Sequence, residues 1–388
     1  METAKQKEFI ELVLKGENVF LTGKAGTGKT WVVKKAIQEL EKQGKRVVCC
    51  APMGVAANNL GGVTVHSLFS LGIHGVASFE TCNWMKGEKR RLLNAVDVVI
   101  IDEVSTLRPD TLDAINWTLL KNSCDGLDTK QVIFVGDLAQ LEAPINDNTR
   151  SVMLRTYNGT EFYHAKIYKK LKVKDIELDE VMRQSDPEFI HHLNIVRNRE
   201  RSDYWRRFIR QEPLGMVLAP YNTTIEDYNR KGLELQKGEI FKFEATVTGK
   251  AKADEFNLPS VIEVKNGCKI MYLANSIDNK ELVNGTLGIF VSHEGCHYIR
   301  VDEVDYSLVE MEFTKKEYVL RNKDLVLEEI GTIRQYPFRL AYALSIHKSQ
   351  GLTFKEVTVD LRRPCFQKGQ LYVALSRVVS PEGLTIIV

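Results

Sequence analysis

The chain has little net charge, few cysteines and no long apolar run, although it is 388 residues long. A formal net charge of +2 argues neither for nor against a polyanionic partner, so any surface for nucleic acid must be local. The seven cysteines form no Cys-x-x-Cys pair, which excludes a zinc site of that kind and favours reduced thiols. No apolar run approaches the roughly 20 residues that span a bilayer, and the N-terminus lacks a signal or transit pattern. We expect a soluble protein without membrane contact, cytoplasmic and nucleoid-associated as in bacteria or phages, and leave a nuclear or mitochondrial location open.

Apolar runs alternate with helical patterns in the first half of the chain. Such buried runs, separated by helices, predict an α/β fold with a parallel sheet, whose ligands lie at the carboxyl ends of the strands. Cys49 and Cys50 are neighbours on one expected strand and should point to opposite faces. The expected strands lie near residues 19–21, 46–51, 96–102 and 131–136, with helices at 30–43 and 109–121.

The length allows two or three domains. We expect a first lobe over residues 1–175, with a small insertion at about 72–94, and a second α/β lobe over 176–235 and 332–388. Short β-branched segments separated by Gly and Asn turns predict a small antiparallel β domain inserted at 236–331. Its expected strands are 261–264, 269–273, 286–291, 297–301 and 307–313.

The strongest chemical signal is an apolar strand that runs directly into Gly-x-x-x-x-Gly-Lys-Thr, which is typical of a phosphate-binding loop (P-loop). Glycines let backbone N–H groups approach phosphates, Lys29 can reach the β- and γ-oxygens, and the Thr30 hydroxyl can ligate Mg²⁺. The alternative is a glycine-rich turn with a chance Lys-Thr. We expect bound ATP and Mg²⁺, with nucleotide contacts from Gly23, Ala25, Gly26, Thr27, Gly28, Lys29 and Thr30.

Two carboxylates lie at the end of the buried strand expected at residues 96–102. Asp102 is placed to hold Mg²⁺ beside Thr30, and Glu103 to polarise the attacking water. In isolation the pair would be an acidic helix start. Gln140, after the following strand, is predicted to sense the γ-phosphate; the alternative there is an ordinary turn at Gly136-Asp137.

Two distant arginines, Arg183 and Arg377, are candidates for stabilising charge at the γ-phosphate. For either one alone, a surface salt bridge is the alternative. If both come from the second lobe, hydrolysis requires the lobes to close, which would convert chemistry into motion.

In this order the motifs resemble those of superfamily 1 helicases, and their finer letters resemble the 5′→3′ class and its Pif-like DNA helicases. RecD-like helicases share the layout but match the letters less closely. The resemblance implies two RecA-like P-loop NTPase lobes with parallel sheets, a small wedge insertion in the first and a small β-barrel inserted in the second. It is carried by residues 51–57 with 61–67, 282–288, 340–353 and 369–377.

The resemblance also implies roles for single residues. Gln6 would read the adenine edge, and Gly351, with Gln350, would link the DNA groove to the nucleotide. Small polar groups and backbone amides can follow a phosphate backbone without reading bases. Met53 stands where relatives usually have Thr. The implied DNA contacts are Pro52, Met53, Gly54, Thr64, His66, Asn222, Asn284, His347, Lys348, Ser349 and Gln350.

The insertion carries Phe79 and Trp84, which are candidates for a wedge tip that stacks on the last base pair. The alternative is a pair of aromatics packed in a small core. We expect a monomeric ATP-dependent helicase that moves 5′→3′ on single-stranded DNA and opens duplex junctions; G-quadruplex and RNA–DNA hybrid substrates are left open. The alternatives are an ATP-switched single-strand clamp, a translocase without unwinding activity, and a P-loop kinase.

Overall fold

The computed structural model describes residues 2–52, 57, 60–72, 76–143, 145–180, 183–256, 258–274, 282, 284–321 and 324–388. The chain divides into two compact units. The first comprises Met1–Arg183 and Lys316–Ile330, and the second comprises Gln184–Lys315 and Gly331–Val388. Within the described part, no helix has both the length and the apolar character needed to cross a membrane. All seven cysteines are free thiols, as the sequence predicts.

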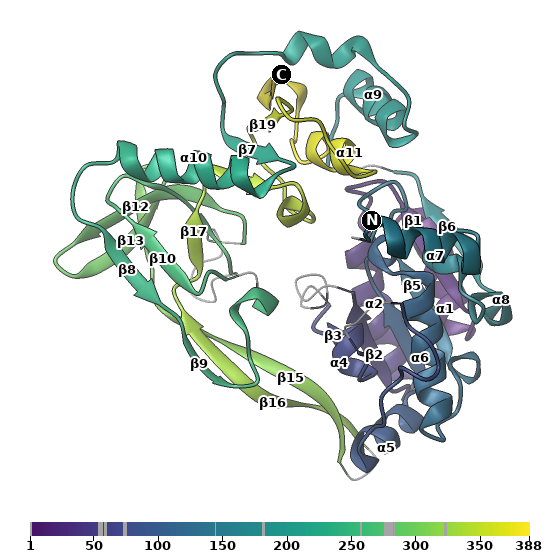
Figure 1. Cartoon of the computed structure of the whole chain (residues 1–388). Coiled ribbons are helices and arrows are strands. Elements are labelled where there is room, and N and C mark those ends of the chain that lie inside the picture. Colours follow the sequence, from purple (N-terminus) through teal and green to yellow (C-terminus); the bar gives the residue numbers. More distant parts are fainter. Residues whose placement is uncertain are drawn as a thin grey trace. The chain divides into compact units, whose positions relative to one another are not determined.

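The first unit is built on a six-stranded parallel sheet (Figure 1). The strand order is β3-β2-β4-β5-β1-β6, so the P-loop strand β1 lies between β5 and β6. The expected strands are all present. Their bounds are β1 Val19–Gly23, β2 Val47–Ala51, β3 Val63–Thr64, β4 Val98–Ile101, β5 Gln131–Val135 and β6 Lys174–Leu178.

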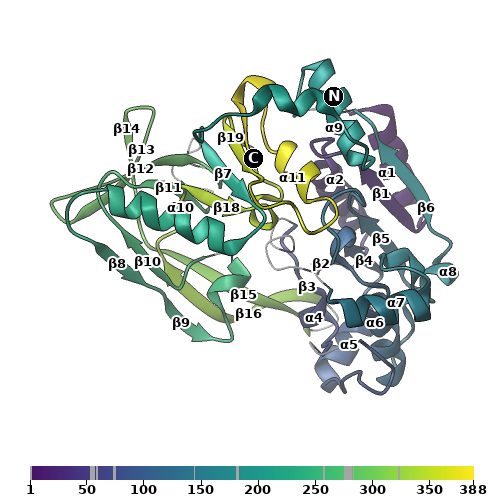
Figure 2. The same cartoon turned by 45° about the horizontal axis from the view of Figure 1, so that its top comes forward.

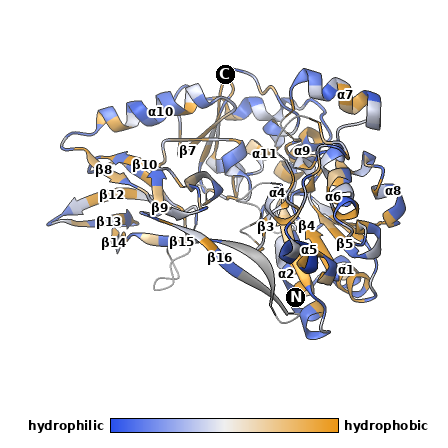
Figure 3. Ribbon diagram, turned by 60° about the horizontal axis from the view of Figure 1, so that its bottom comes forward, coloured by the Kyte–Doolittle hydropathy of each residue, from blue (hydrophilic) through white to orange (hydrophobic). Residues whose placement is uncertain are grey.

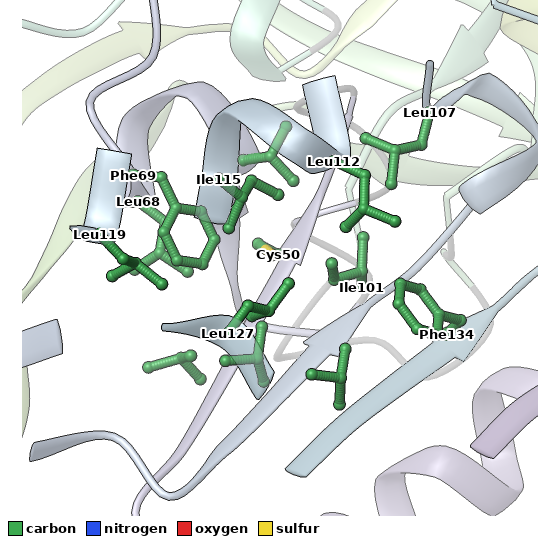
Figure 4. Close-up of a cluster of buried hydrophobic side chains, with 14 of the residues drawn as sticks. Cys50, Leu68, Phe69, Ile101, Leu107, Leu112, Ile115, Leu119, Leu127 and Phe134 are labelled. Atoms are coloured by element: carbon green, nitrogen blue, oxygen red, sulfur yellow. The ribbon is translucent and has the colours of Figure 1, made fainter. Parts of the chain in front are cut away.

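Helices cover both faces of this sheet. Helices α1 (Ala4–Leu14) and α2 (Lys29–Lys42) share one hydrophobic cluster with Cys49 and alternate strand residues. Helices α4 (Val65–Leu68), α5 (Gly87–Ala95) and α6 (Pro109–Lys121) pack on the other face with Cys50. Figure 4 shows Cys50 with side chains of α4 and α6. The two cysteines therefore point to opposite faces, which confirms the expected alternation along β2. Helices α7 (Asp147–Tyr157) and α8 (Tyr168–Leu171) also belong to this unit.

The expected boundary between the lobes at residues 175 and 176 is wrong. Strand β6 runs across it and pairs with β1 over its whole length, from Val19 opposite Lys174 to Gly23 opposite Leu178. Because strand pairing places β6 in the first sheet, the first unit continues to Arg183.

The second unit contains a four-stranded parallel sheet in the order β18-β7-β19-β20 (Figure 2). Its strands are β7 Met216–Ala219, β18 Ala343–Ser345, β19 Val357–Asp360 and β20 Leu384–Ile387, and its helices are α9 Pro187–Arg197, α10 Asn222–Leu235 and α11 Gln370–Leu375. Helix α10 carries many hydrophilic residues, whereas the strands of the first sheet are strongly hydrophobic (Figure 3).

The strands between α10 and β18 pair antiparallel. The described strands form a pair (β10-β8), a five-stranded sheet (β14-β13-β12-β11-β17) and a three-stranded sheet (β15-β16-β9). Closure of these sheets into a barrel stays a prediction. Their bounds are β8 Phe241–Glu244, β9 Thr246–Gly249, β10 Val261–Val264, β11 Lys269–Tyr272, β12 Leu287–His293, β13 Cys296–Val301, β14 Val304–Ser307, β15 Met311–Arg321, β16 Asp324–Gln335 and β17 Phe338–Leu340.

Two expectations for this region are wrong. The β region does not end at residue 331, because β16 continues to Gln335 and β17 pairs antiparallel with β11, as Leu340 opposite Ile270 shows. The single strand expected at 307–313 is in fact two strands. Residue 307 ends β14 and residue 311 begins β15, and residues 308–310 between them belong to no strand.

Candidate nucleotide and DNA sites

The P-loop connects β1 to the N-terminus of α2. Gly28 caps the helix with a left-handed backbone (φ 80°), and the buried Thr27 donates from Oγ1 to the Lys24 carbonyl at 3.0 Å. Lys29 begins the helix, and its Nζ donates to the carbonyls of Gly23 at 2.7 Å and Lys24 at 3.0 Å. The lysine is thus folded back over the loop whose amides would hold phosphate.

These residues fit a triphosphate with Mg²⁺. A helix N-terminus with a left-handed glycine presents backbone N–H groups and a favourable dipole to an anion. The Lys29 ammonium is held by neutral carbonyls, which are weaker acceptors than phosphate oxygens. Thr30 is exposed in the first turn of α2, so its hydroxyl is accessible to a metal ion. A metal ion bound there would neutralise phosphate charge.

Gln6 reaches the P-loop from α1. Its side chain is buried, and its Nε2 donates to the Thr27 carbonyl at 3.5 Å. Its Oε1 accepts from the Thr3 amide at 3.1 Å, while the Thr3 hydroxyl accepts from the Gln6 amide, which makes a capping box at the start of α1. The side chain therefore links the N-terminal helix to the phosphate loop, and its contact with adenine stays a prediction.

Asp102 and Glu103 follow β4, as predicted. Asp102 is buried, and burial together with the neighbouring Glu103 charge raises its pKa to about 7, although the Glu103 amide and the Lys29 charge act to lower it. A buried carboxylate that lacks a full counter-charge is suited to a divalent cation. Glu103 adopts a left-handed backbone (φ 50°), and Thr106 holds it by donating its hydroxyl to the Glu103 carbonyl at 2.9 Å.

The turn after β5 places Gln140 in a buried position. The Gln140 Nε2 lies 3.4 Å from an oxygen of the fully buried Asp137, whose other oxygen accepts from the Ala139 amide at 3.1 Å. Gly136 lies so near Val104 that a Cβ there would come within 3.0 Å of the Val104 side chain. The turn is therefore built against the Asp102-Glu103 segment, and γ-phosphate sensing by Gln140 stays a prediction.

Arg183 lies in the first unit and not in the second, which corrects the expected lobe assignment. A Cβ placed on Gly26 would lie 2.6 Å from the Arg183 Cβ, so the chain after β6 passes directly over the P-loop. The sequence could not show this, because the pairing of β6 with β1 brings the two segments together. Its transition-state role stays a prediction.

The first-unit residues assigned to DNA lie partly outside the described residues, which include neither Met53 nor Gly54. Pro52 is half-buried directly after β2. Thr64 caps α4, and its hydroxyl accepts from the Ser67 amide at 3.2 Å. His66, on α4, is half-buried, and burial and the Arg108 charge lower its pKa, so it is neutral at pH 7.

The sequence analysis did not identify the ion pair of Arg108 and Asp110, whose charges act on His66. Arg108 donates to both oxygens of the fully buried Asp110, from Nε at 2.9 Å and Nη2 at 2.6 Å. Asp110 also accepts from the Ala77 amide at 2.8 Å. This charged pair joins the segment after Glu103 to the insertion that carries Phe79. The only local signal was Arg-Pro-Asp at the start of α6, which also suits an ordinary helix start.

In the second unit, Asn222 and Lys348 line one cavity of about 640 Å³ with Ser345 and Arg339. The Asn222 side chain is at the first residue of α10, and Lys348 follows β18, so both lie where parallel strands end. His347 shares a hydrogen bond between its Nε2 and the Gln367 Oε1 at 2.8 Å. The structure thus places two of the predicted DNA contacts, Asn222 and Lys348, on one cavity, and His347 directly precedes Lys348.

Ser349 does not fit the predicted role. It has no exposed surface, and its hydroxyl donates to the Ile346 carbonyl at 2.8 Å. A side chain so buried cannot contact a phosphate in this conformation, so Ser349 supports the turn instead. Gln350 is half-buried, and Gly351 follows it with a left-handed backbone (φ 80°).

Arg377 is buried, and its guanidinium hydrogen-bonds to groups of its own unit. Its Nε donates to the Val373 carbonyl at 2.9 Å, and its Nη1 lies 3.4 Å from the Ser349 carbonyl and 3.3 Å from that of Leu352. Nη2 donates to the Ser376 hydroxyl at 2.7 Å. The guanidinium therefore ties α11 to the turn that follows His347, which argues against the surface salt bridge considered for it.

Asn284 is exposed in a turn before β12, and Gly285 beside it has φ 95°.

In the insertion, the Phe79 and Trp84 side chains are 45% and 75% exposed. The alternative, that these rings are packed in a small core, is therefore wrong. Lys121, at the end of α6, lies with its Nζ 5.7 Å from the centroid of each ring. The same Nζ donates to the carbonyls of Phe79, Glu80 and Cys82, so one lysine holds the segment that presents both rings.

Comparisons with known proteins agree with this layout. The family model of PIF1-like helicases matches residues 2–204, more than half of the 388-residue chain. The ATP-dependent DNA helicase Pif1 of Campylobacter jejuni is 28% identical over 97% of this chain and 90% of its own. The ATP-dependent DNA helicase Pif1 of Bdellovibrio bacteriovorus is 30% identical over 99% of this chain and 87% of its own length.

Solved structures extend the likeness to the fold. Pif1 from Bacteroides sp in complex with ADP-AlF4 is 31% identical, covers 100% of this chain and 92% of its own, and matches with a TM-score of 0.89. The same helicase bound to single-stranded DNA matches with a TM-score of 0.70. The expected α/β fold with RecA-like lobes is therefore confirmed.

Proposed function

Because this chain belongs to the PIF1-like helicase family, we propose that it is an ATP- and Mg²⁺-dependent DNA helicase that moves 5′→3′ along single-stranded DNA and opens duplexes at junctions. The observation that carries the proposal is the joint presence of a complete P-loop site and a second cluster of candidate phosphate contacts. The P-loop site holds Lys29 with Asp102, and the second cluster holds Asn222 with Lys348.

The chemistry follows from the residues of each site. Lys29 and the amides of the P-loop bind the β- and γ-phosphates, and Thr30 with Asp102 would hold Mg²⁺, which neutralises phosphate charge when bound. Glu103 orients the attacking water, and Arg183 stabilises the charge that develops at the γ-phosphate. Arg377 would do the same once its guanidinium leaves the carbonyls that it contacts in this conformation. Phosphoryl transfer needs positioning and charge neutralisation more than covalent help, which suits this set of groups.

The DNA contacts explain why such a motor would be insensitive to sequence. Asn222, His347 and Lys348 offer an amide, an imidazole and an ammonium to a phosphate backbone, which is the same at every base. Binding should therefore weaken as salt rises, and unrelated oligonucleotides of equal length and composition should bind alike.

The deciding experiment is unwinding of two partial duplexes under ATP and Mg²⁺, one with a 5′ single-stranded tail and one with a 3′ tail. We expect only the 5′-tailed duplex to open. Opening of the 3′-tailed duplex alone would reverse the proposed direction. Opening of neither, with ATP still hydrolysed in the presence of DNA, would indicate a translocase, and hydrolysis that DNA fails to stimulate would indicate a clamp.

Lys29→Ala is the matched control for this experiment. We expect it to lose ATP hydrolysis and unwinding while it keeps its affinity for single strands, because the DNA contacts lie elsewhere. Normal turnover by Lys29→Ala would contradict the assignment of the nucleotide site. Phosphate transfer to a nucleoside acceptor, rather than release of free phosphate, would identify a kinase.

A further inference from the structure

One loop of the second unit carries exposed aromatic and basic side chains that the proposed function does not use. It lies between β19 and α11, at the edge where the parallel strands of this sheet end. Phe366 in this loop is 60% exposed. Arg363 and Lys368 are exposed on either side of it in the sequence. Ligands of α/β sheets bind at this edge.

Phe366 belongs to a cluster of three side chains. Its ring centroid lies 5.0 Å from that of Tyr221, the residue that caps α10. The Arg363 guanidinium lies 3.7 Å from the centroid of the same Tyr221 ring, and its Nη1 donates to the Thr223 hydroxyl at 3.1 Å. A guanidinium at that distance is stacked on the ring face. We call Tyr221, Arg363 and Phe366 the aromatic platform.

The loop that carries the platform is held firmly at both ends. Arg362 donates to the buried Asp360 carboxylate and to the Tyr228 hydroxyl, at 3.1 Å from its Nε to Oδ1 and 3.0 Å from its Nη2 to the hydroxyl. The amides of Phe366 and Gln367 both donate to Oε1 of the fully buried Gln370, at 3.0 and 3.2 Å. An exposed ring on a fixed backbone loses little conformational entropy when a ligand stacks on it.

The platform adjoins the candidate phosphate contacts. Tyr221 directly precedes Asn222, and Gln367, next to Phe366, is hydrogen-bonded to His347. Strands β7, β18 and β19, which end before these three segments, are neighbours in the sheet. Aromatic rings and a basic side chain beside phosphate-binding groups suit one ligand class, a nucleobase of a single strand.

We propose that Phe366, supported by Tyr221 and Arg363, stacks against a base of single-stranded nucleic acid, so that the second unit holds the strand by base stacking as well as by phosphate contacts; this rests on the proposed function. Stacking on an aromatic ring accepts any base, because every base has a π-face. The platform thus adds affinity without adding sequence preference.

The experiment compares binding of fluorescently labelled oligothymidylate with binding of an oligonucleotide of equal length in which central positions are abasic, followed by anisotropy at several salt concentrations. We expect wild type to prefer the base-containing strand. Phe366→Ala should weaken binding of that strand about fivefold or more and leave the abasic strand unaffected, so that the preference disappears. Phe366→Tyr should keep it.

Two controls separate stacking from other effects. Leu235→Ala removes a side chain that is 79% exposed on the same unit and should leave both affinities unchanged. Phe366→Ala should keep the wild-type dependence of affinity on salt, whereas Lys348→Ala, which removes a charge, should reduce that slope by about one unit. A 2-aminopurine base placed in the bound strand should be quenched by wild type and not by Phe366→Ala.

Equal weakening of both strands by Phe366→Ala, or no change in either, would overturn the platform. Wild type that binds both strands equally would overturn it while leaving the helicase intact. Wild type that binds neither strand would overturn the platform and the proposed function together.

Discussion

Arg183 packs on the P-loop glycine Gly26, so closely that a Cβ on Gly26 would lie 2.6 Å from the Arg183 Cβ. The contact joins the segment after the last strand of the first sheet to the loop that would hold phosphate. Gly26 also has a left-handed backbone (φ 82°), which any other residue would adopt only under strain.

Gly26→Ala is expected to displace either the P-loop or the Arg183 segment, and to lower ATP hydrolysis by more than about tenfold, since catalysis depends on placement within about an ångström. Gly44→Ala is the matched control, because Gly44 has a similar backbone (φ 76°) with open space around it. Both variants should lose about 1 kcal/mol of stability from backbone strain. Equal hydrolysis by the two variants would show that the contact with Arg183 is unimportant.

Arg377 should have two separable effects when replaced. Arg377→Ala removes the donors of several buried carbonyls, so we expect a loss of about 1–3 kcal/mol of stability. If Arg377 also stabilises the transition state, hydrolysis at saturating ATP should fall by ~10³ or more while ATP still binds. Thermal unfolding, ATP binding and turnover should be measured on Arg377→Ala and Arg377→Lys. Near-normal turnover by either variant would remove the transition-state role and leave the structural one.

Lys121 should hold the insertion that presents Phe79 and Trp84. In Lys121→Ala, we expect faster amide hydrogen exchange across residues 78–84 and weaker unwinding, because three carbonyls lose their common donor. ATP hydrolysis stimulated by single strands should persist, since neither candidate site contains Lys121. Lys42→Ala, which removes a lysine that is 70% exposed at the end of α2, is the control. Unchanged exchange across 78–84 would contradict this account.

His66 should make stability fall in mild acid. Its pKa in the folded protein is below the ordinary 6.5, because burial and the Arg108 charge disfavour the protonated ring and outweigh the opposing Asp110 charge. The unfolded chain therefore takes up the proton first as the pH falls below about 6.5, and stability is lost through that window. Thermal unfolding at pH 7.5, 6.5 and 5.5 should show a smaller decline for His66→Gln than for wild type. Identical declines would contradict the assigned shift.

The sequence determined the features that depend on neighbouring residues. The Gly-x-x-x-x-Gly-Lys-Thr pattern after an apolar strand predicted the P-loop, and alternation along one strand predicted that Cys49 and Cys50 face opposite sides. Helix α6 was predicted with its observed bounds, because proline at its first position and a regular apolar pattern are local signals. The position of Asp102 and Glu103 at the sheet edge was also predicted from local signals, because the residues that directly follow a strand lie at the edge where that strand ends.

Only the tertiary structure decided which sheet a strand joins and what a side chain contacts. Strand β6 carries no local mark of its partner, so its pairing with β1, and the position of Arg183 over Gly26, depend on residues about 155 positions apart in the ladder. The burial of Ser349 and Arg377 depends on the packing of α11 against the turn after β18. The aromatic platform likewise requires β7 and β19 to lie side by side, which places Tyr221 against residues more than a hundred positions later in the chain.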